Sequence, residues 1–241
     1  MFRFFIDESN IIDDNYIEIN DKEDFHHGKN VLRLKIGENL ELISKRNKYI
    51  AEIIEIKSES IRTKVLEKIE LKNNSTIIKL YQGMPKSDKF EFIIQKSVEL
   101  GVDEIVPFES ERTIVKFKAK SYNKKQERYE KIIKAAAMQS KRNNIPKINY
   151  PIRIDDIELD DGEFGILAYE ESDLPIREVL KNLKEYNKIS IVIGPEGGFS
   201  KNEVDCLISK GFNSVLLGDR ILRTETASLN LLSIIGYELE R

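Results

Sequence analysis

The sequence predicts an α/β protein of two parts, a small strand-rich domain over residues 1–70 and a larger domain over residues 75–241 with a mainly parallel sheet. Three observations predict this fold class. Short runs of alternating apolar and polar residues, separated by tight turns, fill the first part, as in small barrels and sandwiches. The stretch from Glu70 to Thr76 is polar and is typical of a linker. Beyond it, strand-like and helix-like segments alternate, which favours a parallel sheet covered on both faces.

In the first part, period-two alternation predicts strands, and Gly, Asn and charged residues predict the turns between them. The turn signal Gly37-Glu38-Asn39 ends one strand, and Lys45–Lys48 forms the tip of a hairpin. Two adjacent histidines, His26 and His27, point in different directions on any regular element. Because the chain has no other histidine and only one cysteine, no metal site is expected. The expected strands cover residues 15–19, 31–36, 40–44, 49–56 and 60–66.

In the second part, apolar residues recur at helical spacing between short apolar runs. The segment 87–100 places Phe90, Ile93 and Val98 on one face and ends at Gly101, a common helix terminator. We expect strands over residues 77–81, 105–108, 165–169, 189–193 and 215–217, and helices over 87–100, 122–142, 175–183, 200–210 and 225–239.

Composition indicates a globular protein of a reducing compartment. The chain has 241 residues, of which 40% are hydrophobic and 34% charged, and it carries a single cysteine. One cysteine excludes an internal disulfide framework. No apolar run approaches the length of a membrane span, and the apolar start Met1–Ile6 is too short for a signal peptide. We therefore expect a cytoplasmic protein.

Positive charge is concentrated in one segment although the net charge of the chain is −3. Residues 111–147 contain twelve basic and three acidic residues, so this segment carries +9. In the helix expected over 122–142, Tyr129 and Ile133 share the apolar face, and Lys124, Arg128, Lys131 and Arg142 fall on the opposite side. Such a face suits an anionic partner, and charge alone leaves a solvated lysine-rich helix equally open.

A glycine-rich loop follows the strand expected over residues 189–193. It has the sequence Gly194-Pro-Glu-Gly-Gly, and Ser200 with Glu203 then forms a capping box that starts a helix. The loop is neither a dinucleotide fingerprint nor a P-loop. Its backbone can approach a ligand closely, with Glu196 as the carboxylate at its centre. The alternative is an ordinary tight turn with a solvated glutamate.

A second unusual stretch, Leu217-Gly-Asp-Arg-Ile-Leu-Arg-Thr-Glu-Thr-Ala, lies between a strand and an apolar helix. Thr224 can cap that helix, and Glu225 suits the positive end of its dipole. Arg220 and Arg223 are cations at the unfavourable end of the helix. They indicate an anionic partner or a negative charge that develops during a reaction.

These motifs carry a resemblance to a known family. The strings IGPEGGFS and LGDRILRTETA, with RFF, NVLRLKIGE, QKSVELGV and AAAMQS, resemble the 16S ribosomal RNA (uracil-N3)-methyltransferases of the SPOUT superfamily. The resemblance runs from Arg3 to the last helix. One departure is Asp219, where proline is common in the family. The resemblance implies an N-terminal PUA-like β-barrel that binds RNA, a C-terminal trefoil knot, a homodimer and S-adenosylmethionine as the cofactor.

The resemblance also implies roles for particular residues. The reaction would methylate N3 of a uridine in 16S ribosomal RNA of the small subunit. The chemistry of removing the N3 proton, rather than the resemblance, makes Glu196 or Glu225 the candidate base and Arg223 the candidate stabiliser of the anion. No metal is implied. The cofactor site would contain Ala168, Tyr169, Glu170, Ile193, Gly194, Pro195, Gly197, Gly198, Leu217, Gly218, Arg220, Ile221 and Leu222. Candidate RNA contacts are Arg3, Arg33, Arg112, Lys116, Lys124, Arg128, Lys131 and Arg142.

Two other classes of function compete with this one. A non-catalytic RNA-binding factor of ribosome assembly would use the same barrel and basic helix, and binding of S-adenosylmethionine would count against it. An enzyme acting on small molecules would leave the barrel and the +9 segment without a purpose.

Overall fold

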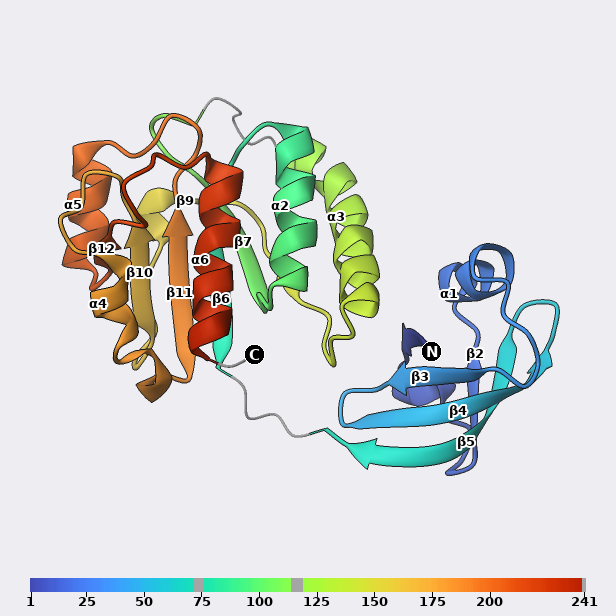
Figure 1. Cartoon of the computed structure of the whole chain (residues 1–241). Helices are drawn as coiled ribbons and strands as arrows, with labels where there is room; N and C mark the ends of the chain where they lie inside the picture. The colour runs from blue at the N-terminus through green and yellow to red at the C-terminus, as the bar shows by residue number, and fades with distance from the viewer. Residues whose placement is uncertain (72–75, 114–118, 240–241) are drawn as a thin grey trace. The chain divides into compact units, whose positions relative to one another are not determined.

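The computed structural model describes residues 1–71, 76–113 and 119–239 (Figure 1). It contains two compact units. The N-terminal unit comprises Met1–Asn74 and Ala137–Asn144, and the C-terminal unit comprises Ser75–Ala136 and Ile145–Arg241. The division into an RNA-binding domain over 1–70 and a methyltransferase domain over 75–241 stays a prediction, and residues 72–75 of the expected linker lie outside the described residues.

The N-terminal unit is built on one five-stranded sheet with the order β1-β3-β4-β5-β2. Only the β1–β3 pair is parallel. A short helix α1 and a turn of π-helix lie between β2 and β3. The elements are β1 (Phe2–Phe5), β2 (Tyr16–Ile19), α1 (Lys22–His26), the π turn (His27–Val31), β3 (Asn39–Ile43), β4 (Asn47–Ile56) and β5 (Ile61–Glu70), with a 3₁₀ turn at Glu8–Asn10.

The sheet of the N-terminal unit curls around an apolar core. Phe4, Ile17, Leu40, Ile53 and Ile61 are fully buried in it, and each comes from a different strand. The strands alternate as period-two patterning requires, since β2 reads half-buried, buried, half-buried, buried. This arrangement confirms a small curled β unit, and the hairpin between β3 and β4 confirms the tip expected near Lys45–Lys48.

The strand expected over 31–36 does not form, so that prediction was wrong. The chain there is a π turn ending at Val31, followed by irregular backbone. Arg33 has a φ of +53°, in the left-handed region that no strand residue adopts. Two elements went unpredicted in this unit, the N-terminal strand β1 and the helix α1.

The C-terminal unit is built on a parallel sheet with the order β12-β10-β11-β6-β7-β8, and β9 also pairs with β7. Alternating strands and helices produce it, as predicted. The elements are β6 (Ile77–Gly83), α2 (Ser87–Glu99), β7 (Glu104–Glu109), α3 (Ala119–Gln139), β8 (Lys147–Ile148), β9 (Ile152–Arg153), β10 (Phe164–Ala168), α4 (Ile176–Leu180), β11 (Lys188–Ile193), α5 (Lys201–Ser209), β12 (Asn213–Val215) and α6 (Thr224–Glu238), with 3₁₀ turns at Ile154–Asp156 and Leu183–Glu185.

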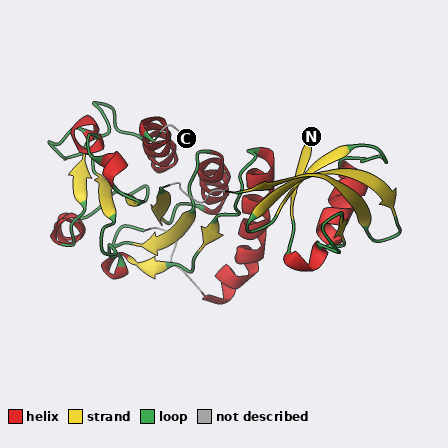
Figure 2. Ribbon diagram, turned by 90° about the horizontal axis from the view of Figure 1, so that it is seen from below, coloured by secondary structure: helices red, strands yellow, loops and turns green. Residues whose placement is uncertain are grey.

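Both faces of this sheet are covered. On β11, Ile191 and Val192 are fully buried although they point to opposite faces. Val192 packs in a cluster with Val204 and Leu207 of α5. Helices α2 and α6 pack side by side, and α6 lies over β6 and β11 (Figures 1 and 2). Apolar side chains dominate the two faces of the sheet, although Lys79 and Gln82 of β6 and Ser190 of β11 are also buried.

Helix α3 is close to its predicted position, since it spans Ala119–Gln139 against the expected 122–142. Its apolar face is as predicted, with Tyr129 and Ile133 each 1% exposed. Helix α4 is shorter than expected, and the short strands β8 and β9 were not predicted.

Candidate active site

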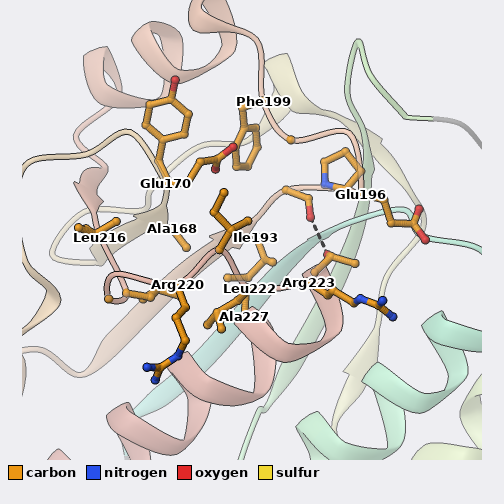
Figure 3. Close-up of a pocket in the computed structure, with 18 of the residues that line it drawn as sticks. Ala168, Glu170, Ile193, Glu196, Phe199, Leu216, Arg220, Leu222, Arg223 and Ala227 are labelled. Atoms are coloured by element: carbon orange, nitrogen blue, oxygen red, sulfur yellow. Dashed lines mark hydrogen bonds between the residues drawn. The ribbon is translucent and has the colours of Figure 1, made fainter.

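A cavity of about 540 Å³ opens where three adjacent parallel strands end. Strand β10 ends at Ala168, β11 at Ile193 and β12 at Val215, and the loops that follow line the cavity (Figure 3). Because parallel strands present their carboxyl ends at one edge of a sheet, loops far apart in the chain meet there. A cavity of this size accommodates a ligand the size of a cofactor.

The cavity brings together twelve of the thirteen predicted cofactor residues. Gly197 is the exception, because it packs against Arg112 outside the lining. The predicted catalytic residues Glu196 and Arg223 line the cavity, whereas Glu225 lines a second cavity between α2 and α6. Residues of the lining that were not predicted are Lys89, Phe199, Leu216, Asp219, Thr224 and Ala227.

A buried hydrogen-bond network fixes the loop after β11 to the start of α6. The Thr224 hydroxyl donates to the Gly194 carbonyl at 2.6 Å and accepts from Gln82 Nε2 at 2.9 Å. The Ser228 hydroxyl donates to Gln82 Oε1 at 2.5 Å. Gln82 and Ser228 are fully buried, so the network is shielded from water. The expectation that Thr224 caps α6 was wrong, because its hydroxyl bonds to another loop and Arg223 holds the N-cap position without a side-chain bond.

The glycines of the loop are required by its own packing. A Cβ on Gly194 would lie 2.9 Å from the Phe199 ring, and one on Gly197 would lie 2.9 Å from the Arg112 carbonyl oxygen. Gly198 has a φ of +69°, which side-chain-bearing residues rarely adopt. Glycine in this loop therefore allows a compact turn, in addition to any close approach by a ligand.

Glu203 ties two segments together beside the loop. Its Oε2 accepts from the Ser200 amide at 2.8 Å, the bond expected of a capping box. Its Oε1 accepts from the Glu111 amide at 2.7 Å. With 8% of the residue exposed, this carboxylate joins the start of α5 to the loop after β7.

Three charged residues, Lys89, Glu196 and Arg223, line one rim of the cavity, and Glu225 lies next to Lys89. Lys89, in the first turn of α2, lies with its Nζ 3.1 Å from Glu196 Oε1 and 3.6 Å from Glu225 Oε2. The hydrogen bond to Glu196, with the charge of Glu225, raises the pKa of Lys89 against the opposing effects of burial and Arg223. The two candidate bases, Glu196 and Glu225, therefore share the ammonium group of Lys89.

The two arginines of the second motif point to different sides. Figure 3 shows Arg223 extending to the side of the cavity that holds Glu196, and Arg220 pointing away from it. Both residues are exposed, and neither forms an ion pair with another residue in the described parts of the chain. A free guanidinium beside Glu196 can meet an anionic group on a substrate.

The loop after β10 places two further polar groups at the cavity. Tyr169 donates its hydroxyl proton to Glu171 at 2.7 Å, and this bond raises the pKa of Tyr169 to about 12, helped by burial and the nearby carboxylates. Glu170 extends toward the Phe199 ring in Figure 3. A carboxylate on the cavity wall can accept hydrogen bonds from ligand hydroxyl or ammonium groups.

The candidate RNA contacts of the C-terminal unit lie on α3 and before it. Lys124, Arg128 and Lys131 are exposed on the outer face of α3, and Arg128 forms an ion pair with Glu91 of α2 at 2.6 Å. Arg112 donates to the Gly197 carbonyl at 3.4 Å, so it contacts the glycine loop. Lys116 lies outside the described residues.

The candidate contacts of the N-terminal unit differ in exposure. Arg33 is exposed, and Arg142 is half-buried. Arg3 is buried, with its side chain 4% exposed, and its guanidinium lies 2.8 Å from Glu41 and 2.7 Å from the Arg142 carbonyl. The donors of Arg3 are therefore directed into the protein and not toward a bound RNA.

No described group of three or more His, Cys, Asp or Glu side chains has the arrangement of a metal site. Within the described helices, no segment combines the length and the apolar character that crossing a membrane requires.

The fold and the cavity define a two-unit α/β enzyme with a small-molecule site at the carboxyl edge of its parallel sheet. Residues 72–236 match the family model of the RNA methyltransferase domain, and residues 19–66 match that of the RNA methyltransferase PUA domain. The chain therefore belongs to the RNA methyltransferase family.

Individual relatives agree with this assignment. The chain is 36% identical over 228 residues to the ribosomal RNA small subunit methyltransferase E of Bacillus subtilis, covering 90% of this chain and 89% of the relative. It resembles the Neisseria gonorrhoeae ribosomal RNA small subunit methyltransferase E, solved bound to S-adenosyl methionine, with 28% identity, a TM-score of 0.86 and coverage of 98% and 97% of the two chains. A Legionella pneumophila methyltransferase solved with the same cofactor has 28% identity, a TM-score of 0.85 and the same coverage.

Proposed function

We propose that this protein transfers a methyl group from S-adenosylmethionine to N3 of a uridine in 16S ribosomal RNA of the small ribosomal subunit. One observation carries the proposal: a cofactor-sized cavity, built by the loops after β10, β11 and β12, has Glu196, Lys89 and Arg223 in its lining, and Glu225 lies 3.6 Å from Lys89. The two relatives with this fold that were solved with S-adenosylmethionine support the choice of cofactor.

The residues present fit this cofactor. The cavity of about 540 Å³ has a wall of backbone and apolar side chains, together with the carboxylate of Glu170. When bound there, S-adenosylmethionine supplies an activated methyl group on a sulfonium ion. The protein must then bind and orient both partners and assist the loss of the N3 proton.

The charged rim suits that proton loss. Glu196 or Glu225 can accept the proton of N3, and the Arg223 guanidinium can stabilise the negative charge that spreads onto the flanking carbonyl oxygens. Because N3 lies on the pairing edge of the base, the target uridine must be unpaired or flipped out of its helix.

RNA would be held by the N-terminal unit and by the exposed face of α3. The match of residues 19–66 to a PUA domain supports the first part, and the exposed Lys124 and Lys131 support the second. Contacts of this kind give affinity for phosphates and position the substrate without reading its sequence. An activity on ribosomal RNA would place the protein in the cytoplasm.

We also propose the trefoil knot and the homodimer. The segment that follows β10 pairs with the end of β12. A β-bridge joins Pro175 to Leu216, and the Tyr169 amide donates a 3.0 Å hydrogen bond to the Val215 carbonyl. This close pairing is compatible with a chain that is threaded through a knot. Tyr237 of α6 is 82% exposed and Phe92 of α2 44% exposed, which suits a covered apolar face. Light scattering of the purified protein tests the dimer.

Mass spectrometry of ribosomal RNA tests the function. Cells that lack this protein should lose one methyl group on a uridine of 16S ribosomal RNA, and the wild-type chain should restore it. Calorimetry should detect binding of S-adenosylmethionine. A protein that binds the RNA but shows neither cofactor binding nor methyl transfer would instead be a non-catalytic assembly factor.

A further inference from the structure

Lys89 has a position that the helix it belongs to does not explain. It lies in the first turn of α2, which spans Ser87–Glu99, where the helix dipole disfavours a cation. Its ammonium is instead held 3.1 Å from Glu196 and 3.6 Å from Glu225, with 30% of the side chain exposed. The ammonium of Lys89 is therefore stabilised by the carboxylates at the cavity, and not by the dipole of its own helix.

The ammonium retains capacity to bind a ligand. An ammonium group has three N–H donors, and Glu196 takes one of them. Glu225 Oε2 is buried and has no hydrogen-bond partner in the described structure, and at 3.6 Å from Lys89 it contributes charge without a hydrogen bond. Lys89 also lines the cavity itself, so its remaining donors can face a bound molecule.

The charged groups that face Lys89 come from two other elements. Glu196 belongs to the loop after β11, and Glu225 and Arg223 belong to the start of α6. The two carboxylates together outweigh the repulsion from Arg223 and the effect of burial, because the pKa of Lys89 is raised. Lys89 is thus a permanent cation at neutral pH.

The pairing edge of uracil has the complementary pattern. N3–H is a donor between two carbonyl oxygens, and after N3 loses its proton the negative charge spreads onto both oxygens. A carboxylate flanked by two cations matches this edge, since the carboxylate faces N3–H and each cation faces one carbonyl oxygen. Glu196 lies beside Lys89, and Arg223 extends to the same side of the cavity (Figure 3).

We propose that Lys89 is a second catalytic cation, which donates a hydrogen bond to a carbonyl oxygen beside N3 and stabilises the uracil anion together with Arg223. This inference rests on the proposed function. The N3 proton passes to the nearby carboxylate, and the electron pair of the N3–H bond stays on N3. That pair forms the new bond to the methyl carbon, and the electrons of the former carbon–sulfur bond stay on the sulfur.

The test compares Lys89→Met, Lys89→Arg and Lys96→Met in the full-length protein. Lys96 is the matched control, because it lies on the same helix, is 36% exposed and pairs with Glu99 at 2.8 Å, away from the cavity. Methyl transfer is measured from neutral to alkaline pH on 16S ribosomal RNA transcribed with uridine or with 5-fluorouridine, whose fluorine makes N3–H more acidic. Calorimetry with S-adenosylmethionine and thermal unfolding report whether each variant folds and binds the cofactor.

For Lys89→Met we expect an activity about 10- to 100-fold lower at neutral pH, with cofactor affinity within about twofold of wild type. The deficit should shrink at alkaline pH and with 5-fluorouridine, because both supply the anion that Lys89 otherwise stabilises. Lys89→Arg should restore most of the activity, and Lys96→Met should match wild type throughout.

A deficit of the same size at every pH and with both transcripts would assign Lys89 a structural role and overturn the inference. Full activity of Lys89→Met would also overturn it. The proposed function fails separately, because it requires the wild-type protein to place a methyl group on N3. If that group is missing, the wild-type reaction shows it before any variant is compared.

Discussion

Replacing Thr224 by valine should loosen the cofactor cavity from beneath. The substitution keeps the shape of the side chain and removes a hydroxyl that is 2.6 Å from the Gly194 carbonyl and 2.9 Å from Gln82 Nε2. Gln82 Nε2 retains one partner, the Gly83 carbonyl at 3.0 Å. The loop after β11 then has no side-chain hydroxyl to fix it to α6.

The expected cost of Thr224→Val follows from these two bonds. A buried hydrogen bond contributes about 1 kcal/mol, and a group left unsatisfied costs about 1–3 kcal/mol, so the C-terminal unit should lose roughly 2–3 kcal/mol. For a unit of this size that loss lowers Tm by about 4–10 °C. We also expect the Kd for S-adenosylmethionine to rise about tenfold, equivalent to about 1.4 kcal/mol.

Thr63→Val is the matched control. Thr63 is fully buried and donates to the Ile17 carbonyl at 3.0 Å, but it belongs to the N-terminal unit. Calorimetry and thermal unfolding followed by circular dichroism should find both variants destabilised, and weaker cofactor binding only in Thr224→Val. Equal cofactor affinity in the two variants would refute the view that this network holds the cavity in shape.

Three further predictions concern the N-terminal unit and the basic helix. Arg3→Met should cost about 3 kcal/mol or more in thermal unfolding, because it leaves Glu41 buried with only Lys48 as a partner, and a loss near zero would contradict this. Burial opposes ionisation of Glu41, but hydrogen bonds from Lys48 and Arg3 outweigh it and lower its pKa. Ionised Glu41 therefore contributes to the free energy of unfolding above its unfolded-state pKa of about 4.3, and this contribution is lost as the pH falls through its lower pKa in the folded protein. Glu41→Gln should remove this part of the pH dependence of unfolding in acid. Replacing both Lys124 and Lys131 by glutamine should weaken RNA binding. The slope of the logarithm of the binding constant against the logarithm of the salt concentration should become smaller by roughly 0.7–0.9 for each phosphate that the variant no longer neutralises. An unchanged slope would show that this face of α3 is an ordinary solvated surface.

Features that depend on residues close together in the sequence were predicted correctly. The apolar face of α3 follows from helical spacing around Tyr129 and Ile133, and the bond from the Ser200 amide to Glu203 follows from a four-residue motif. The glycine-rich loop over residues 194–198 was predicted as a ligand loop because it follows an apolar strand, whereas the other two candidate cofactor loops came from the family resemblance. These features depend on neighbours in the sequence, which a single chain displays.

Features that depend on distant partners were missed or misread. Nothing near Lys89 in the sequence indicates that it meets Glu196 and Glu225, because only the folded sheet brings α2, β11 and α6 together. Arg3 was predicted as a candidate RNA contact because of its positive charge. Its ion pair with Glu41 could not be predicted from the sequence, because only the pairing of β1 with β3 brings the two residues together. The alternation in residues 31–36 suggested a strand, but the left-handed backbone at Arg33 prevents one.

The N-terminal unit has a consequence for how such proteins can be dissected or recombined. Residues Ala137–Asn144, which comprise the end of α3 and the turn after it, belong to this unit although they are far from β5 in the sequence. Arg3 holds this segment by donating to the Arg142 carbonyl and to Asn143 Oδ1. A fragment that stops after β5 would lack these partners and leave an arginine with unanswered donors. A transfer of the N-terminal unit between relatives must therefore include both Met1–Asn74 and Ala137–Asn144, unless the recipient protein already has a segment that is compatible with the transferred sheet.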